Sequence, residues 1–93
     1  MIQSFKHKGL QELFVNSKTK RLPQERLKKI KMILAAIDAA TSLEDLRIPA
    51  FRLHELKKPP YKGFWSVDVT ANYRLIFRFV EGDAHDVDYK DTH

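Results

Sequence analysis

The N-terminal part of the chain carries apolar side chains at helical spacing. Within residues 8–15, Leu10, Leu13 and Phe14 recur at intervals that place them on one face of a helix. A longer stripe follows at the same spacing: Leu27, Ile30, Ile33, Leu34 and Ile37. Because Pro23 suits the first turn of a helix, the pattern predicts a second, amphipathic helix from about Pro23 to Ala40.

After Pro49 the apolar positions alternate, which is the spacing of a β-strand. The alternation predicts strands at residues 51–56, 65–69, 74–80 and 85–89. Pro59-Pro60 ends the first of these, and residues 81–83 form a hairpin turn. The expected fold is therefore α+β, with two N-terminal helices packed on one face of a small antiparallel sheet and residues 2–5 as a strand at its edge. A length of 93 residues predicts a single domain over 1–93.

The chain carries 17 Lys and Arg against 12 Asp and Glu, a net charge of +5. The excess lies in residues 1–31, where nine basic residues stand against two acidic ones. This basic segment favours a polyanionic partner, although a solvated helix face has the same composition. The absence of cysteine excludes disulfides, thiolate metal sites and cysteine nucleophiles. The longest apolar run, residues 32–37, is too short to span a bilayer, so a cytoplasmic protein without a membrane partner is expected.

The candidates for chemistry begin with the histidines, which are His7, His54, His85 and His93. They do not pair at the spacing of helical metal ligands, so no metal site is expected. His54 and Lys57 lie at the end of one predicted strand, and Arg74 begins a central one. A histidine can transfer a proton near neutral pH, and a guanidinium suits a phosphate. A salt bridge from Arg74 to Asp68 or Asp88 is the purely structural alternative. These residues alone indicate a small basic domain that binds RNA or protein, or a nuclease.

Six segments of the chain form a recognisable series: residues 2–10 (IQSFKHKGL), 34–41 (LAAIDAAT), 53–57 (LHELK), 63–67 (GFWSV), 72–77 (NYRLIF) and 87–93 (VDYKDTH). In order and spacing the series resembles the HigB-type killer toxins of the RelE/ParE superfamily of toxin–antitoxin systems. The likeness runs over the whole chain. It departs from the family pattern at Thr92, where Tyr is usual, and at residues 58–62, where a K-G-D run is usual.

The resemblance implies a compact microbial-RNase-like fold and a ribosome-dependent endoribonuclease that cuts mRNA in the ribosomal A site. The reaction would be attack by the RNA 2′-hydroxyl on the adjacent phosphate, with no metal or other cofactor. The implied partners are the ribosome, its mRNA and a helix-turn-helix antitoxin of the HigA type, through which alone the protein would contact operator DNA. By position, the resemblance assigns the active site to five residues: His54, Lys57, Arg74, Asp91 and His93.

In this interpretation His54 and His93 transfer protons, and Asp91 orients one of them. Arg74 and Lys57 bind the phosphate. The basic residues of the second helix, Lys28, Lys29 and Lys31, would bind ribosomal RNA through salt-sensitive contacts.

The sequence leaves two alternatives to this interpretation open. One is a ParE-type toxin that poisons DNA gyrase by binding alone. The other is a catalytically weak member that acts mainly with its antitoxin as a repressor partner, which Thr92 makes conceivable. His54 and His93 favour the enzyme, because a toxin that acts only by binding has no use for paired titratable groups.

Overall fold

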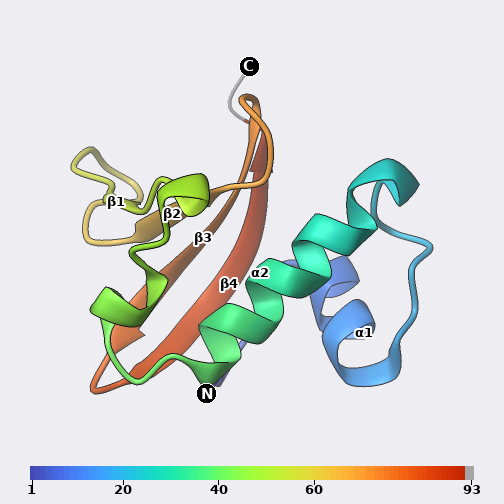
Figure 1. The fold of residues 1–93 in the computed structure, drawn as a ribbon, viewed down its shortest axis with the longest axis horizontal. Helices are drawn as coiled ribbons and strands as arrows, with labels where there is room; N and C mark the ends of the chain where they lie inside the picture. The colour runs from blue at the N-terminus through green and yellow to red at the C-terminus, as the bar shows by residue number, and fades with distance from the viewer. Residues whose placement is uncertain (92–93) are drawn as a thin grey trace.

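In residues 1–91, the part of the chain that the structure describes, two helices pack against one face of a four-stranded antiparallel sheet (Figure 1). This computed structural model has helices α1 (Lys8–Asn16) and α2 (Leu27–Ala39). The strands are β1 (His54–Glu55), β2 (Trp65–Asp68), β3 (Tyr73–Val80) and β4 (Asp83–Asp91), which lie side by side in that order. Short 3₁₀ turns occur at Gln24–Arg26, Leu43–Leu46 and Pro49–Phe51. The predicted α+β order is confirmed.

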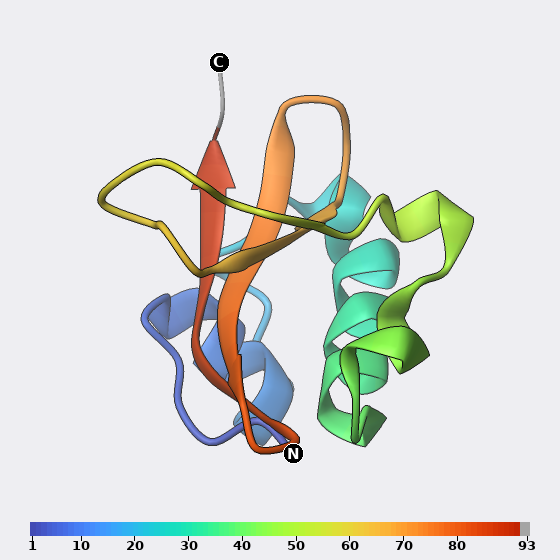
Figure 2. The same ribbon diagram turned by 90° about the vertical axis from the view of Figure 1, so that its left-hand side faces the viewer.

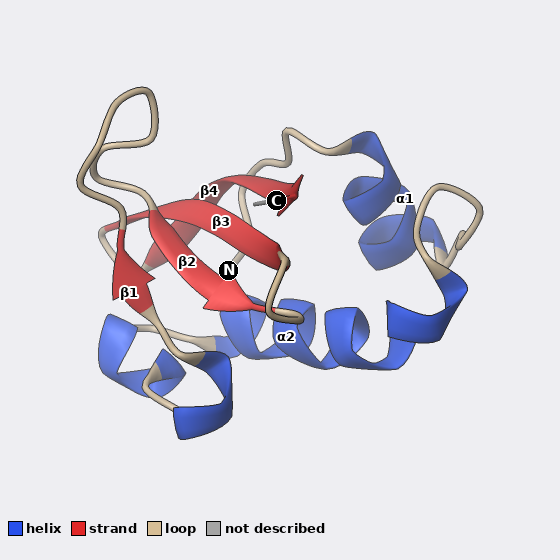
Figure 3. Ribbon diagram, turned by 90° about the horizontal axis from the view of Figure 1, so that it is seen from above, coloured by secondary structure: helices blue, strands red, loops and turns tan. Residues whose placement is uncertain are grey.

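The core lies between α2 and the sheet. The predicted stripe of α2 is its buried face, since Ile30, Ile33 and Ile37 have no exposed surface. Leu75 and Phe77 of β3 are buried from the other side, and Figure 3 shows α2 running along the sheet with α1 beside it. Because successive strand residues point to opposite faces, burial of these two places their neighbours in β3 on the face away from the helices.

Local interactions determine where the helices begin and end. His7 caps α1, because its Nδ1 accepts a hydrogen bond from the backbone N–H of Leu10 at 3.2 Å. Ser17 ends α1 in the left-handed conformation, with φ of 57°. Before α2, Glu25 lies in the first turn of the 3₁₀ segment, where a negative charge is favourable. Within residues 1–91, neither α1 nor α2 is long and apolar enough to cross a membrane.

Two of the predicted strands are shorter than the alternation indicates. The strand expected over residues 51–56 contracts to His54–Glu55, because Pro49–Phe51 form a 3₁₀ turn and Arg52 has φ of 50°, outside the β region. The strand expected over residues 2–5 is reduced to isolated parallel bridges from Ile2 to Ala84 and from Phe5 to Val87. The N-terminal segment does lie along the edge strand β4, as predicted, but without a continuous ladder.

The capping role of His7 predicts how the stability of the protein depends on pH. Burial lowers the pKa of His7 below its ordinary value of 6.5; Asp88 opposes the shift and Arg21 adds to it. The folded protein therefore favours neutral His7, whose Nδ1 can accept the capping hydrogen bond. The stabilisation is complete above the unfolded pKa and is lost as the pH falls through the lower, folded pKa.

In His7→Asn, the amide caps the helix but does not titrate in this range. Urea unfolding of both proteins between about pH 8 and pH 5 measures the effect. The free energy of unfolding of the native protein is expected to fall further with acid than that of His7→Asn. Parallel curves for the two proteins would contradict the assignment of His7 as a neutral cap.

Candidate functional site

The sheet face turned away from the helices carries a cluster of polar side chains. The strand register pairs His54 with Ser66, Ser66 with Ile76, and Asp68 with Arg74. Paired residues share a face of the sheet, so these side chains project together from β1, β2 and β3. His54 and Arg74 are 20 positions apart in the chain, and the register brings them into contact.

The contact between Arg74 and His54 determines the state of the imidazole. Nη1 of Arg74 lies 3.0 Å from Nε2 of His54, and Nδ1 of His54 lies 2.9 Å from the carbonyl oxygen of Arg52. A guanidinium has donors only, so Arg74 donates and Nε2 accepts. Nδ1 then carries the ring proton and donates it to the carbonyl of Arg52. His54 is therefore the neutral Nδ1–H tautomer, with its basic nitrogen directed at Arg74.

Asp68 provides the carboxylate of this cluster. Its Oδ1 is 3.7 Å from Nε of Arg74, and its Oδ2 is 3.3 Å from Nε of Arg52. The distance of 3.7 Å is too long for a hydrogen bond, so the attraction to Arg74 is coulombic. Only 14% of the Asp68 side chain is exposed, which weakens the screening by solvent. The structural alternative for Arg74, a salt bridge to Asp68, is confirmed, and the same guanidinium also contacts His54.

A pocket of about 250 Å³ opens beside Arg74. It is lined by Leu56, Tyr61, Ser66, Arg74, Ile76, Lys90 and Asp91. In Figure 2 the segment that joins β1 to β2 passes close to the end of β4. Nζ of Lys90, in β4, lies 4.8 Å from the ring centre of Tyr61, in that segment. The Tyr61 hydroxyl raises the pKa of Lys90, against the opposing effect of burial. The pocket therefore combines apolar walls with the positive charges of Arg74 and Lys90 and the carboxylate of Asp91.

The predicted site residues are only partly gathered by the structure. His54 contacts Arg74, and Asp91 lines the same pocket as Arg74. Lys57 is exposed on the segment that follows β1. His93, together with Thr92, lies outside the described residues.

Sequence reasoning missed Lys90 as a member of the site, and it considered Tyr61 only as a ring that could replace the Tyr usual at position 92. Lys90 pairs with Arg74 in the register of β3 and β4, so strand alternation was an available signal for it. Tyr61 lies in an irregular segment, where periodicity carries no information about direction.

The opposite side of β3 and β4 holds a stack of aromatic and cationic groups. The rings of Tyr73 and Tyr89 lie 5.5 Å apart and within 8° of parallel. Arg26, just before α2, covers Tyr73 at 4.2 Å, and the ring of His7 meets Tyr89 edge-on. Burial raises the pKa of Tyr89, while Arg26 opposes the shift. This stack joins the ends of both strands to the helices and leaves Tyr89 turned away from the pocket.

The basic residues of α2 lie beside its buried stripe. Lys28 and Lys31 are exposed and Lys29 is half-buried, as the spacing predicts. A second basic surface lies on the loop between α1 and α2, where Lys18, Lys20 and Arg21 gather.

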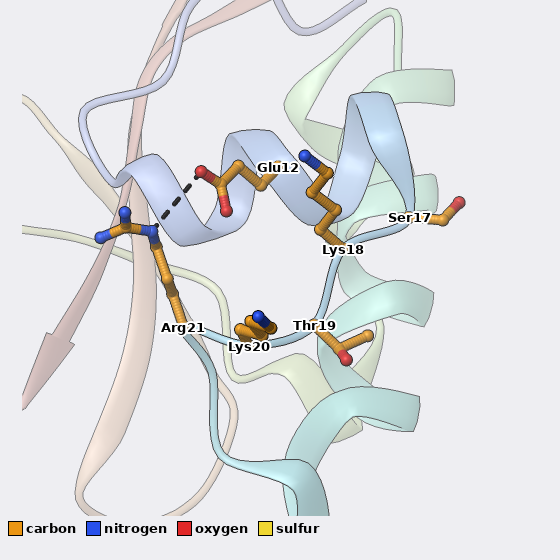
Figure 4. Close-up of a pocket in the computed structure, with 6 residues that line it drawn as sticks. All are labelled: Glu12, Ser17, Lys18, Thr19, Lys20 and Arg21. Carbon is orange, nitrogen blue, oxygen red and sulfur yellow. Dashed lines mark ion pairs between the residues drawn. The ribbon is translucent and has the colours of Figure 1, made fainter.

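This loop encloses a larger hollow of about 470 Å³, lined by Glu12, Ser17, Lys18, Thr19, Lys20 and Arg21 (Figure 4). Its one carboxylate, Glu12, is paired with Nε of Arg21 at 3.4 Å. The hollow contains no histidine, so it offers charge but no group for proton transfer near neutral pH. Within residues 1–91, His, Asp and Glu side chains do not gather in threes as a metal ion requires.

Solved structures share this fold. Two structures of YafQ from Escherichia coli, one from strain BL21(DE3) and one of a variant, each superpose with a TM-score of 0.55. They are 14% and 15% identical to this chain, and each alignment covers 98% of this chain and 91% of the other. At this identity the similarity establishes the architecture alone.

Sequence comparisons identify the family. The family model described as RelE-like toxin of type II toxin-antitoxin system HigB matches residues 3–93. Endoribonuclease HigB of Proteus vulgaris is 43% identical over 93 residues, and the alignment covers all of both chains. Toxin HigB-1 of Vibrio cholerae is 36% identical over 94 residues, which is all of this chain and 98% of the relative.

The match to the family model over residues 3–93 identifies a small toxin of the RelE-like class. Within that class, the chain belongs to the HigB-like family of type II toxin–antitoxin systems. Membership in such a system implies an antitoxin partner.

The ion pairs of Asp68 with Arg52 and Arg74 predict how a substitution there changes stability. Asp68→Asn removes the charge that faces Arg52 and Arg74, and it is expected to cost roughly 1–2 kcal/mol of unfolding free energy because Arg74 stays partly buried. Glu44→Gln, which breaks the exposed pair with Arg47, is the matched control and should cost about 0–1 kcal/mol. Urea unfolding measures both values. Equal costs for the two variants would show that Asp68 acts as an ordinary surface charge.

Proposed function

We propose that this chain is an endoribonuclease that cuts mRNA in the ribosomal A site and so stops translation. The observation that carries the proposal is the 3.0 Å contact between Arg74 and a neutral His54, beside a pocket that also contains Asp91. A phosphate-binding cation next to an unprotonated imidazole is what transfer of a phosphodiester requires. The 43% identity to a relative named Endoribonuclease HigB supports the same activity.

The proposed reaction is transesterification within the RNA. A base removes the proton of a 2′-hydroxyl, and that oxygen forms a bond to the adjacent phosphorus. The bond from phosphorus to the 5′-oxygen breaks, and an acid protonates the leaving oxygen. The products are a 2′,3′-cyclic phosphate and a 5′-hydroxyl, and the reaction consumes no water and no cofactor. Hydrolysis of the cyclic product gives the 3′-phosphate.

In this mechanism His54 exchanges protons through Nε2, the nitrogen that accepts from Arg74 in the free protein. When a phosphate binds Arg74, the guanidinium turns its donors to the phosphate oxygens and frees Nε2. Arg74 then stabilises the charge that develops on phosphorus, an effect worth about 3–4 kcal/mol for one well-placed donor. His93 is the second proton carrier, Asp91 orients one histidine, and Lys57 adds charge at the phosphate.

The partners proposed here are the ribosome with its mRNA and an antitoxin of the HigA type that carries a helix-turn-helix domain. The antitoxin would block the toxin and bind the operator DNA, which the toxin would contact only through it. These events belong to the cytoplasm, where ribosomes and operator meet. Lys28, Lys29 and Lys31 give the surface that binds ribosomal RNA.

The first test concerns the histidines. His54→Ala should slow cleavage of ribosome-bound mRNA by roughly 10²–10⁴-fold, because general acid–base catalysis has that magnitude. Deletion of His93 should have an effect of the same order. His85→Gln is the matched control, since His85 lies on β4 and pairs with Arg78, away from the pocket residues. Full cleavage by His54→Ala would contradict the proposal and favour a toxin that acts by binding.

The second test concerns the basic surface of α2. Replacement of Lys28, Lys29 and Lys31 together by Gln should weaken ribosome association and make its dependence on salt shallower, because fewer counterions are released. The fold should survive, since exposed changes cost less than about 0.5 kcal/mol each. A double variant, Lys18→Gln with Lys20→Gln, removes charge from the loop between α1 and α2 and serves as the control. Sedimentation with ribosomes at several salt concentrations measures both, and an unchanged affinity of the triple variant would exclude this surface.

A further inference from the structure

The pocket beside Arg74 is lined by both apolar and charged side chains. Leu56, Tyr61 and Ile76 make its walls apolar, while Arg74 and Lys90 supply two positive charges and Asp91 one negative charge. Its volume of about 250 Å³ is below the roughly 300–1,000 Å³ typical of sites for drug-sized ligands. A space of this size takes one flat ring system, and the two cations favour a ring that is attached to a phosphate.

Tyr61 is held in place as a wall of the pocket. Its ring meets Phe64 edge-on with centres 5.5 Å apart, and Nζ of Lys90 lies over the ring, 4.8 Å from its centre. The backbone around it is also fixed, because Tyr61 N–H donates to the carbonyl of Lys58 and Phe64 N–H donates to the carbonyl of Tyr61. An aromatic ring that is already ordered loses little conformational freedom when a second ring stacks on it.

Ser66 adds an unused hydrogen-bonding group to the same pocket. Its side chain has no exposed surface, and its Oγ has no hydrogen-bond partner among residues 1–91. A buried hydroxyl without a partner destabilises a folded protein. Such a group is explained when a ligand supplies the missing partner, and a hydroxyl can both donate to and accept from the edge of a nucleobase.

We propose that this pocket binds one nucleobase of the RNA substrate, stacked on Tyr61 and hydrogen-bonded to Ser66, next to the phosphate that Arg74 holds. The inference rests on the proposed function and extends it from cleavage to the choice of codon. Stacking on Tyr61 accepts any base, whereas Ser66, fixed in the sheet, hydrogen-bonds only to a base that places a polar edge atom within its reach. Tyr61 therefore contributes binding affinity for the base, and Ser66 contributes the preference among codons.

The test measures cleavage of ribosome-bound mRNAs that differ only in the codon at the A site. Tyr61→Leu keeps an apolar side chain but removes the stacking ring, and it should lower cleavage about tenfold or more. Tyr61→Phe should stay within about twofold of the native protein, because the ring remains. Lys62→Gln, an exposed change in the next residue, is the control for charge and for the loop.

Ser66→Ala separates a binding role from a structural one. The variant should flatten the differences among codons while it melts at the same or a higher temperature, because no native hydrogen bond is lost. A lower melting temperature with an unchanged codon profile would mean that Ser66 is merely part of the core, and would overturn its role.

The remaining outcomes distinguish failure of the base-binding pocket from failure of the proposed function. Native rate and codon profile in Tyr61→Leu would overturn the pocket, as would a loss of cleavage explained entirely by weaker ribosome association. If the native protein cleaves no ribosome-bound mRNA, the proposed function fails. NMR titration with the four nucleoside 5′-monophosphates then decides on the pocket alone. Shifts at Tyr61 and Ser66 of the native protein, with the Ser66 shift lost in Tyr61→Leu, would support the base site, and their absence from the native protein would reject it.

Discussion

Arg74 is held between a carboxylate and an imidazole, and the arrangement of the site depends on this placement. Asp68 attracts the guanidinium from β2, while Nε2 of His54 in β1 accepts a hydrogen bond from it at 3.0 Å. Since an arginine always donates, the contact also selects the neutral tautomer of His54. In the proposed mechanism, this one guanidinium positions the base and presents the charge that a phosphate needs.

The placement of Arg74 follows from the burial of its neighbours. Leu75 and Phe77 are fully buried against α2, which forces Arg74 to the opposite face of β3. On the helix side, Tyr73 stacks with Tyr89 beneath Arg26, so the end of β3 is fixed from both faces. The apolar core and the stack thereby give the polar face a defined geometry, which catalytic groups need in order to act at a common point.

Much of the fold could be predicted from the chain because long periodic segments determine their own structure. The stripe from Leu27 to Ile37 specified α2 and its buried face, and alternation specified β3. Alternation failed at residues 51–53, where the backbone turns before β1 and apolar side chains recur without a ladder. The contact of His54 with Arg74 could not be predicted from the residues alone, because it depends on strand register and on a β1 of only two residues. Tyr61 could not be placed either, since the direction of a side chain in an irregular segment follows from tertiary contacts.

The reaction proposed for this polar face is cleavage of RNA through activation of a 2′-hydroxyl of the substrate. The most direct test is single-turnover cleavage of a ribosome-bound mRNA with one 2′-deoxynucleotide at the position of the cut, beside the unmodified message. We expect the single substitution to abolish cleavage at that position, and the unmodified message to yield a 5′-hydroxyl on the downstream fragment. Continued cleavage of the deoxy-substituted message, or a 5′-phosphate on the downstream fragment, would contradict it.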